Sequence, residues 1–256
     1  MITDVNVSLS RWPFRRLPDD QFANFVKRLQ ACSVSEAWAG SFDGMLHKDF
    51  EGVNARLYET CRRCDSVTLR PMGTVNPVFP DWQEDLQRCV KKYRMPGIRL
   101  FPNYHGYKLD HPALNELLTL ADRYGLIVQI ALRMEDTRMQ HPMVRVPDVD
   151  VKPLPALVAA HPKLRLVLIN ALGRVRGKML TQLTQAGQIY FEIGMLEGVG
   201  GVGKLLTQIP LERLLFGSHF PLFVLESAVL KLQESALDRD QLAAITRGNA
   251  RRLLKG

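Results

Sequence analysis

Chemically reactive residue types stand near the ends of several short apolar runs of this 256-residue chain. His219 follows one such run, and an imidazole whose pKa is near neutrality is suited to act as a general base for water. Arg99 and Arg133 stand near the ends of two other runs, and guanidinium groups bind carboxylates through paired hydrogen bonds. These residue types favour a site for a small anionic substrate.

The other candidate residues are a phenol, a second imidazole, amides, a hydroxyl and a carboxylate. The residues predicted to polarise a substrate carbonyl are Tyr104, His105 and Gln129. The remaining predicted substrate-binding residues are Asn6, Ser8, Asn170 and Glu192. Structural alternatives stay open for several of the candidates. One alternative for His219 is that its ring simply fills space and hydrogen-bonds to Asn6 or Asn170. Arg99 could instead form an internal ion pair with Glu192. Tyr104 and His105 could simply cap a turn.

The elements that would position these residues alternate along the chain. Short runs rich in β-branched residues, typical of strands, cover 2–8, 34–39, 67–75, 97–101, 126–131, 164–170, 189–193 and 214–217. Segments with helical spacing cover 19–31, 49–63, 80–93, 111–124, 151–161, 174–186, 198–209 and 222–237. Strands that are apolar on both faces, each followed by a helix, predict a (β/α)₈ TIM barrel of the α/β class, with a doubly wound open sheet as the alternative.

A barrel would bring the candidate residues together, because active sites of this fold lie at the carboxyl ends of the strands. No Ser/Gly-rich linker divides the chain, so residues 1–256 are expected to form one domain. Residues 238–256 are predicted to form two short helices that pack on the outside.

Composition excludes several classes of function. The chain has 34 Lys and Arg against 26 Asp and Glu, a net charge of +8, and 46% hydrophobic residues, which is typical of a folded domain rather than a disordered one. Its basic pairs are scattered, so we expect small anions as partners and no nucleic acid. No leader sequence and no membrane-spanning run is recognisable, and four cysteines fit reduced thiols, so a cytoplasmic protein without a membrane partner is expected. Barrel enzymes are commonly homo-oligomers, and the sequence is compatible with either a monomer or a homo-oligomer.

Two short motifs are weaker signals. The glycine-rich segment 198–204 fits part of a phosphate-binding loop, but Leu205 stands where a Ser or Thr should bind Mg²⁺. It is therefore predicted to be a flexible loop that tolerates an anion, without nucleotide binding. Cys61 and Cys64 have redox spacing but lie late in a predicted helix, so their thiols are predicted to be inert.

Four segments together resemble the amidohydrolase-related (amidohydrolase 2) family of TIM-barrel hydrolases. They are Gly-Ile-Arg-Leu-Phe-Pro-Asn-Tyr-His-Gly-Tyr (97–107), Gln-His-Pro (140–142), Phe-Gly-Ser-His-Phe-Pro (216–221) and Gly-Asn-Ala-Arg-Arg-Leu (248–253). The resemblance runs from residue 3 to residue 253. Members of this family typically carry Asp-x-His-x-His on the first strand, further histidines after the fifth and sixth strands, and Gly-Ser-Asp after the eighth.

The sequence departs from the family at every expected metal ligand. Asn6 and Ser8 replace the first two histidines, Ala131 and Asn170 stand in the fifth-strand and sixth-strand regions, and His219 occupies the position of the aspartate. Neutral amide and hydroxyl oxygens bind divalent transition metals weakly, so we expect no catalytic metal and no cofactor.

The resemblance therefore implies a metal-independent hydrolase of a carboxylated lactone or amide, because some relatives hydrolyse carboxylated lactones without a metal. The alternative is a non-catalytic relative that binds a small anion or a protein partner. A water-accessible His219 near the arginines would favour the hydrolase, whereas a buried His219 that is already hydrogen-bonded would be compatible with the binding protein.

Overall fold

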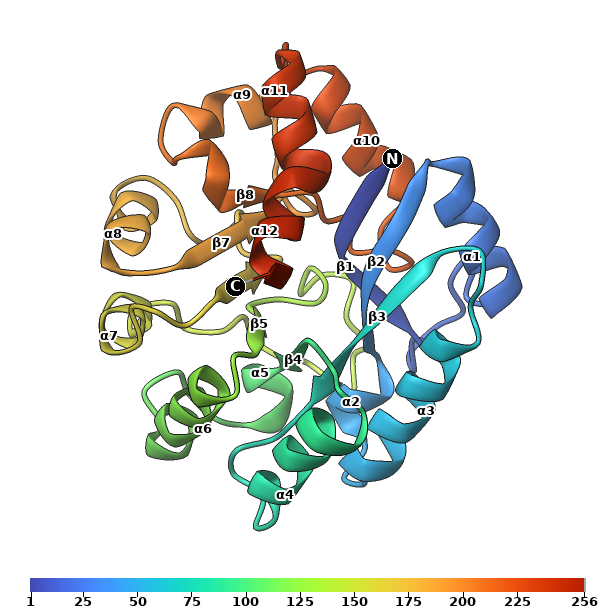
Figure 1. Ribbon diagram of the computed structural model, residues 1–256, viewed down its shortest axis with the longest axis vertical. Coiled ribbons are helices and arrows are strands. Elements are labelled where there is room, and N and C mark those ends of the chain that lie inside the picture. Colours follow the sequence, from blue (N-terminus) through green and yellow to red (C-terminus); the bar gives the residue numbers. More distant parts are fainter. Residues whose placement is uncertain (256) are drawn as a thin grey trace.

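Eight parallel strands follow one another around a barrel in chain order in the computed structural model, which describes residues 1–255 (Figure 1). They are β1 (Ile2–Leu9), β2 (Val34–Ser41), β3 (Thr68–Thr74), β4 (Gly97–Leu100), β5 (Ile127–Ala131), β6 (Leu166–Ile169), β7 (Ile189–Glu192) and β8 (Leu214–Leu215). The barrel closes where Val5 N–H donates to the Phe216 carbonyl at 2.9 Å and Val7 pairs in parallel with Phe220. The predicted (β/α)₈ barrel is confirmed, and the open sheet is excluded.

Each segment of predicted helical spacing contains a helix. The helices that follow the eight strands are α1 (Phe22–Ala31), α3 (Phe50–Arg62), α4 (Trp82–Gln87) with η1 (Arg88–Lys92), α6 (Pro112–Arg123), α7 (Leu154–Ala160), α8 (Lys178–Ala186), α9 (Gly201–Leu206) and α10 (Leu225–Gln233). Three short elements not predicted from the sequence are α2 (Asp43–Leu46), α5 (Pro102–His105) and the 3₁₀ turn η2 (Leu211–Arg213). No helix among residues 1–255 is both long enough and apolar enough to cross a membrane.

The C-terminal tail crosses the amino ends of the strands. It consists of α11 (Arg239–Ala243), a π-helical turn η3 (Ala244–Gly248) and α12 (Asn249–Lys255), and α12 lies in front of the barrel in Figure 1. The two predicted tail helices are thus present, joined by η3, and Gly256 lies outside the described residues. Leu253 and Ala250 of α12 are buried in the same apolar cluster as Val5 and Leu215, so the tail closes the amino end of the barrel.

Apolar side chains also fill the barrel at the carboxyl ends of its strands. Trp12, Phe42, Phe101 and Met134 come from the loops after β1, β2, β4 and β5, and each is at most 2% exposed. The ring of Trp12 meets Phe42 edge-on at 5.1 Å. Any polar residue deeper in the barrel is therefore separated from water by this apolar layer.

We predict that Gly97→Ala destabilises the protein by about 3 kcal/mol, because overpacking against rigid backbone forces strands apart. An added Cβ at Gly97 would lie 2.2 Å from the carbonyl oxygen of Ile127 on the neighbouring strand. Gly173→Ala is the matched control, since nothing lies within 4 Å of its added Cβ. Urea unfolding of both variants measures the difference, and equal free energies of unfolding would contradict the packing argument.

Candidate functional site

Seven of the ten predicted site residues meet inside the barrel. They are Asn6, Ser8, Arg99, Gln129, Asn170, Glu192 and His219, and none is more than 2% exposed. The register of β1 against β2 shifts between Asp4 and Val7. At this irregularity two consecutive side chains face the interior. Val5 packs among the inner apolar residues, and Asn6 reaches across the barrel to Asn170. We call these seven residues the polar layer.

Arg99 is the cation of the polar layer. Its Nε donates to Gln129 Oε1 at 2.8 Å, and its two terminal nitrogens donate to the carbonyls of Val7 (2.9 Å) and Trp38 (3.2 Å) and to Ser8 Oγ (3.2 Å). Burial lowers the pKa of Arg99 to about 10, so the side chain is still charged at neutral pH. The guanidinium group is thus held by neutral acceptors, and within residues 1–255 it forms no ion pair with Glu192.

His219 is sealed inside the barrel. Its Nε2 lies 2.6 Å from the Met134 carbonyl, so Nε2 carries the proton, and its Nδ1 faces the side-chain amide nitrogen of Asn170 at 3.4 Å. Burial lowers the pKa of His219 to about 4, which keeps the ring neutral at pH 7. This geometry matches the space-filling alternative, in which His219 hydrogen-bonds to Asn170.

The two asparagines bind each other. Asn6 Nδ2 donates to Asn170 Oδ1 at 2.8 Å, and Asn170 Nδ2 donates to the Arg133 carbonyl at 2.7 Å. Glu192 accepts the backbone N–H groups of Asn170 (2.6 Å) and Gly194 (2.5 Å), and burial raises the pKa of its carboxyl group. Asn6 Oδ1 is buried without a partner. The polar layer is therefore satisfied almost entirely by its own members and the surrounding backbone.

Two residues of this region have an unusual backbone conformation. Asn170 and His219, which follow β6 and β8, have φ angles of 57° and 62°. Left-handed conformations of residues other than glycine cost of order 1–3 kcal/mol each and persist where the surroundings determine them. The contact between the two side chains ties these strained positions to each other.

The residues at the family's ligand positions do not fit a divalent metal. Asn170 Oδ1 accepts from Asn6, Ser8 accepts from a guanidinium group, and His219 Nε2 is committed to a carbonyl, which leaves the neutral amide oxygen of Asn6 as the one unpartnered oxygen among these side chains. Zinc and manganese need imidazole, thiolate or carboxylate ligands, and a fixed cation at Ser8 opposes a second positive charge there. In the described part of the chain, no cluster of three or more His, Cys, Asp or Glu side chains has the spacing of a metal site.

Asp4 is a member of this network that the sequence analysis did not single out. Its carboxyl group accepts Ser218 Oγ at 2.5 Å, Ser218 N–H at 3.1 Å and Asn6 N–H at 3.0 Å. Burial raises the pKa of Asp4 to about 7. Asp4 is the first residue of the pattern Asp-x-Asn-x-Ser on β1, and this alternation indicates that its side chain faces the same side as Asn6 and Ser8. Asp4 fastens β1 to the segment after β8 and so holds the barrel closed.

Tyr104, His105 and Arg133 lie outside the polar layer. His105 Nε2 lies 2.8 Å from the Gly44 carbonyl, and burial lowers the pKa of this ring to about 4. Tyr104 packs against the inner apolar cluster, and burial raises its pKa. The guanidinium group of Arg133 makes a bidentate pair with Asp148 at 2.7 and 2.8 Å. No hydrogen bond within residues 1–255 joins these three side chains to His219.

The prediction that Cys61 is inert agrees with the structure. Burial raises the pKa of Cys61 to about 12, which keeps its thiol protonated at neutral pH.

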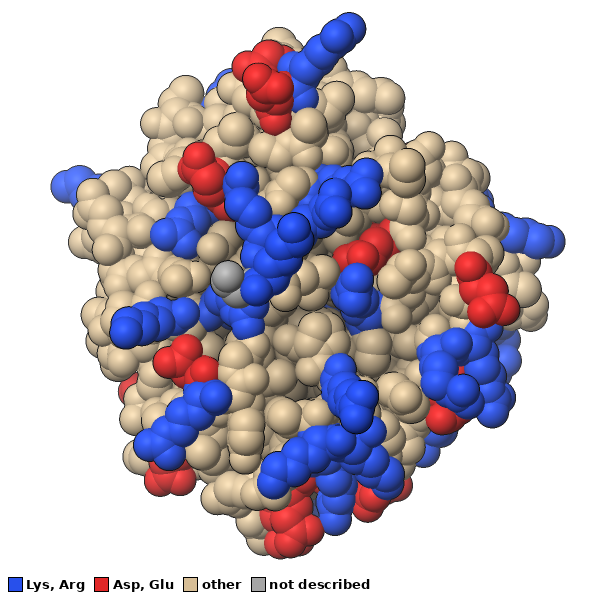
Figure 2. All heavy atoms as spheres, in the orientation of Figure 1, with Lys and Arg blue, Asp and Glu red and all other residues tan. Residues whose placement is uncertain are grey.

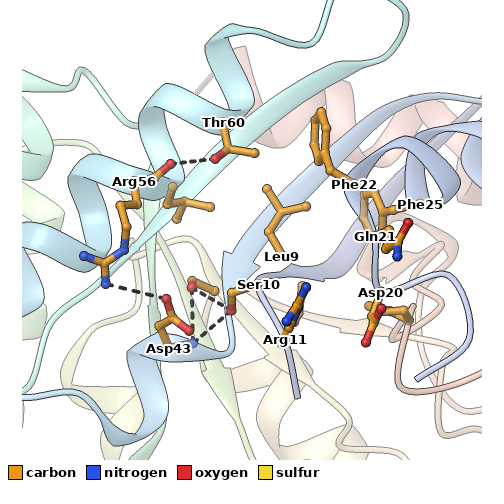
Figure 3. A pocket seen from close by; sticks show the side chains of 14 residues that line it. Leu9, Ser10, Arg11, Asp20, Gln21, Phe22, Phe25, Asp43, Arg56 and Thr60 are labelled. Carbon is orange, nitrogen blue, oxygen red and sulfur yellow. Dashed lines mark hydrogen bonds and ion pairs between the residues drawn. The ribbon is translucent and has the colours of Figure 1, made fainter. Parts of the chain in front are cut away.

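An open cavity of about 440 Å³ lies beside the ends of β1 and β2 (Figure 3). Its apolar wall is formed by Leu9, Phe22, Phe25, Leu57 and Pro221, and its polar wall includes Ser8, Ser10, Ser41, Arg11, Asp20, Asp43, Arg56 and Thr60. Ser8 belongs to both regions, because its Oγ also accepts from Arg99. This cavity could not be predicted from the sequence, since it arises only where α1 and α3 flank two strand ends.

The charged residues of the cavity differ in whether they have an ion-pair partner. Asp20 is held by Arg16 through two hydrogen bonds of 2.6 and 2.8 Å, and Asp43 pairs with Arg56 at 3.5 Å. Arg11 is exposed and forms no ion pair within the described residues. The hydrogen bond from Arg16 lowers the pKa of Asp20, and the charge of Arg11 helps to lower it, but the guanidinium donors of Arg11 have no hydrogen-bond partner within residues 1–255 and are available to a ligand.

Comparison with known proteins identifies the family. The sequence profile described as "Amidohydrolase" matches residues 13–256. The chain belongs to this family, as the resemblance predicted. No curated protein matches it.

Solved structures share the fold at low identity. A dihydroxybenzoic acid decarboxylase from Polaromonas sp. JS666, with bound manganese and 2-nitroresorcinol, has a TM-score of 0.77 at 13% identity and covers 100% of this chain and 97% of its own. The 5-carboxyvanillate decarboxylase of Sphingomonas paucimobilis has a TM-score of 0.76 at 14% identity, covering 99% and 98%. An uncharacterised TIM-barrel protein from Bordetella bronchiseptica gives the same values. At these identities the likeness establishes the fold only.

The buried His219 predicts a specific pH dependence of stability. Its folded pKa of about 4 lies below the ordinary value of 6.5, so its contribution is present above pH 6.5 and is lost as pH falls from 6.5 to 4. We expect acidification from pH 7 to 4.5 to cost the wild type more stability than His219→Gln, by on the order of 2 kcal/mol. Urea unfolding across this range measures the difference.

Asp4 provides a control of opposite sign. Its folded pKa of about 7 lies above the ordinary 3.8, so its contribution is present below pH 3.8 and is lost as pH rises from 3.8 to 7. The Asp4→Asn variant should therefore lose less stability than the wild type over this rise. Parallel pH profiles for the wild type and both variants would contradict the burial of these groups.

Proposed function

We propose that this chain binds a small carboxylated ligand at the carboxyl-end face of its barrel and does not use the metal-dependent chemistry for which the fold is suited. The observation that supports this is the state of His219, which is 1% exposed and hydrogen-bonded to the Met134 carbonyl. A general base must reach its water, and the apolar layer shields this ring from bulk solvent. The self-satisfied polar layer then acts as a structural core.

The ligand site is the cavity beside β1 and β2. Arg11 supplies an unpaired guanidinium group, which matches the two oxygens of a carboxylate. Phe22, Phe25 and Leu57 supply apolar surface for a ring or short hydrocarbon. A carboxylated aromatic acid combines these two features. The 2,6-dihydroxybenzoate bound to a decarboxylase of similar fold belongs to the same chemical class.

Loss of the Arg11 charge should weaken binding. We expect the wild type to bind 2,6-dihydroxybenzoate and Arg11→Ala to bind it at least about tenfold more weakly, because a charge-assisted hydrogen bond is lost. Arg63→Ala is the matched control, since Arg63 is exposed at the end of α3 outside the cavity. Isothermal titration calorimetry gives the dissociation constants. Equal affinity of the wild type and Arg11→Ala, or no binding by the wild type, would refute the site.

Hydrolysis of a carboxylated lactone or amide is the second candidate function. The neutral ring of His219 favours it, because Nδ1 keeps a lone pair that only the 3.4 Å contact with Asn170 occupies. After rearrangement of the apolar layer, Nδ1 would take a proton from water, the hydroxide would attack the carbonyl carbon, and the proton would pass to the leaving oxygen or nitrogen. The buried Trp12 Nε1 has no partner in the closed arrangement and would gain one on opening.

In that mechanism the other residues keep the roles assigned from the sequence. Carboxylate binding would fall to Arg99 and Arg133, carbonyl polarisation to Tyr104, His105 or Gln129, and further substrate contacts to Asn6, Ser8, Asn170 and Glu192. Most of these groups would first have to exchange their present partners, because Arg99 and Arg133 are already hydrogen-bonded. The binding protein needs no such rearrangement.

A turnover assay separates the two candidates. We expect no hydrolysis of carboxylated lactones or amides by protein from which metals have been removed by chelation. The expected rate is the same as that of His219→Gln, because the ring has no access to water. Turnover by the wild type that falls by a factor of about 100 or more in His219→Gln would establish the hydrolase instead.

A further inference from the structure

A second groove lies on the opposite face of the barrel, where the tail crosses the amino ends of the first three strands. Its volume is about 420 Å³. One wall is formed by Arg247 of η3 with Arg251 and Lys255 of α12, and the other by the starts of β1, β2 and β3. Leu254 is the one apolar side chain among its lining residues. The groove is therefore shaped for a polar ligand.

Within residues 1–255, no carboxylate pairs with the cations that η3 and α12 contribute to this groove. Residues 244–255 contain four Lys and Arg and no Asp or Glu. Within the part of the chain that the structure describes, Arg247, Arg251 and Lys255 form no ion pair. Figure 2 shows the Lys and Arg side chains that gather over α12 on this face. Three unpaired cations at steps of four residues thus follow one side of the tail.

The carboxylate that lines the groove has another partner. Both oxygens of Glu36 are used by Arg70, with Oε1 2.9 Å from Nε and Oε2 3.0 Å from a terminal nitrogen. Glu36 also accepts the indole N–H of Trp38 at 3.3 Å. Because this carboxylate is committed, it does not compensate the charges on η3 and α12.

The wall that carries the cations is held in place by the barrel. Asn249 Nδ2 donates to the carbonyls of Leu211 (2.7 Å) and Leu214 (2.6 Å), and Leu253 is 2% exposed beneath the helix. The guanidinium group of Arg165, which precedes β6, donates to the Leu253 carbonyl. The backbone from which the three cations project is therefore fixed before a ligand arrives, which lowers the entropic cost of binding.

We propose that this groove binds a small anion with at least two phosphate or carboxylate groups. Guanidinium groups bind such oxyanions through paired hydrogen bonds, and cations spaced along one helix side fit charges separated by a few ångströms. The hydroxyl groups of Thr3 and Thr68 lie among the lining residues and supply further donors, whereas Ser35 Oγ donates to the Ile2 carbonyl. The lining contains no aromatic ring on which a nucleobase could stack, which favours a compact polyanion over a nucleic acid.

The test compares charge reversal inside and outside the groove. Isothermal titration calorimetry with inorganic pyrophosphate, at low ionic strength, is performed on the wild type, Arg251→Glu and Arg239→Glu. Arg239 is exposed on the same tail but does not line the groove, so it is a matched control. We expect Arg251→Glu to weaken pyrophosphate binding by at least about tenfold and Arg239→Glu to change it by less than about threefold. Circular dichroism and thermal unfolding confirm that both variants are folded.

Three further arms define the ligand. Orthophosphate should bind more weakly than pyrophosphate, because it cannot span two cations. The dissociation constants of citrate and pyrophosphate are also compared. Tighter binding of citrate would identify a polycarboxylate as the preferred ligand, and tighter binding of pyrophosphate a phosphate compound. Arg11→Ala should bind pyrophosphate like the wild type, so this result does not depend on the cavity beside β1.

Three results would overturn the proposal. The first is that the wild type binds neither pyrophosphate nor citrate, and the second is that the wild type and Arg251→Glu bind them equally. The third is tight binding of a short DNA duplex that Arg251→Glu abolishes while neither small anion binds, which would assign the groove to nucleic acid.

Discussion

A charged arginine without a carboxylate partner stands in the middle of this barrel, and the arrangement of the surrounding residues follows from the need to stabilise it. Removing a guanidinium group from water costs several kcal/mol, and an isolated buried charge is tolerated only where hydrogen bonds replace its hydration. Arg99 obtains them from two strand carbonyls, a serine hydroxyl and a glutamine amide. Position 40 is occupied by glycine, and a Cβ there would lie 2.6 Å from an Arg99 nitrogen, so any other residue would collide with the guanidinium group. Gln129 is fixed in turn by the Val5 carbonyl at 2.7 Å.

The acidic groups of the interior complement this cation from a distance. Asp4 and Glu192 both favour the charged form of Arg99, although neither touches it, and burial raises the pKa of each carboxyl group. Each carboxylate is instead stabilised locally by N–H and O–H donors at the strand ends. The charges are thus satisfied by backbone and side-chain dipoles that are fixed by the barrel itself. Within the described residues, Asn6 Oδ1 is the one buried polar side-chain atom of the polar layer that lacks a hydrogen-bond partner.

Periodicity and residue type predicted the architecture because each strand and helix is encoded by its own segment. All eight strand runs and all eight helical segments are present, and the family is confirmed. The accessibility of His219 could not be predicted in the same way. It depends on Trp12 and Met134, whose loops fold over the barrel through contacts between distant segments. Arg133 illustrates the same difficulty, because its partner Asp148 lies fifteen residues away in a long loop.

The position of Arg99 also explains why replacing individual ligands would not recreate a metal centre. Histidine at position 8 would have to share its place with the guanidinium group that now donates to Ser8 Oγ. Histidine at position 6 would break the hydrogen bond that joins Asn6 to Asn170, and with it the support of two left-handed residues. A metal would bring a second positive charge beside Arg99, where the low dielectric of the interior makes repulsion strong. The central arginine and the paired asparagines therefore oppose a divalent cation at these positions for two separate reasons: repulsion between like charges, and loss of the hydrogen bonds that support the strand ends.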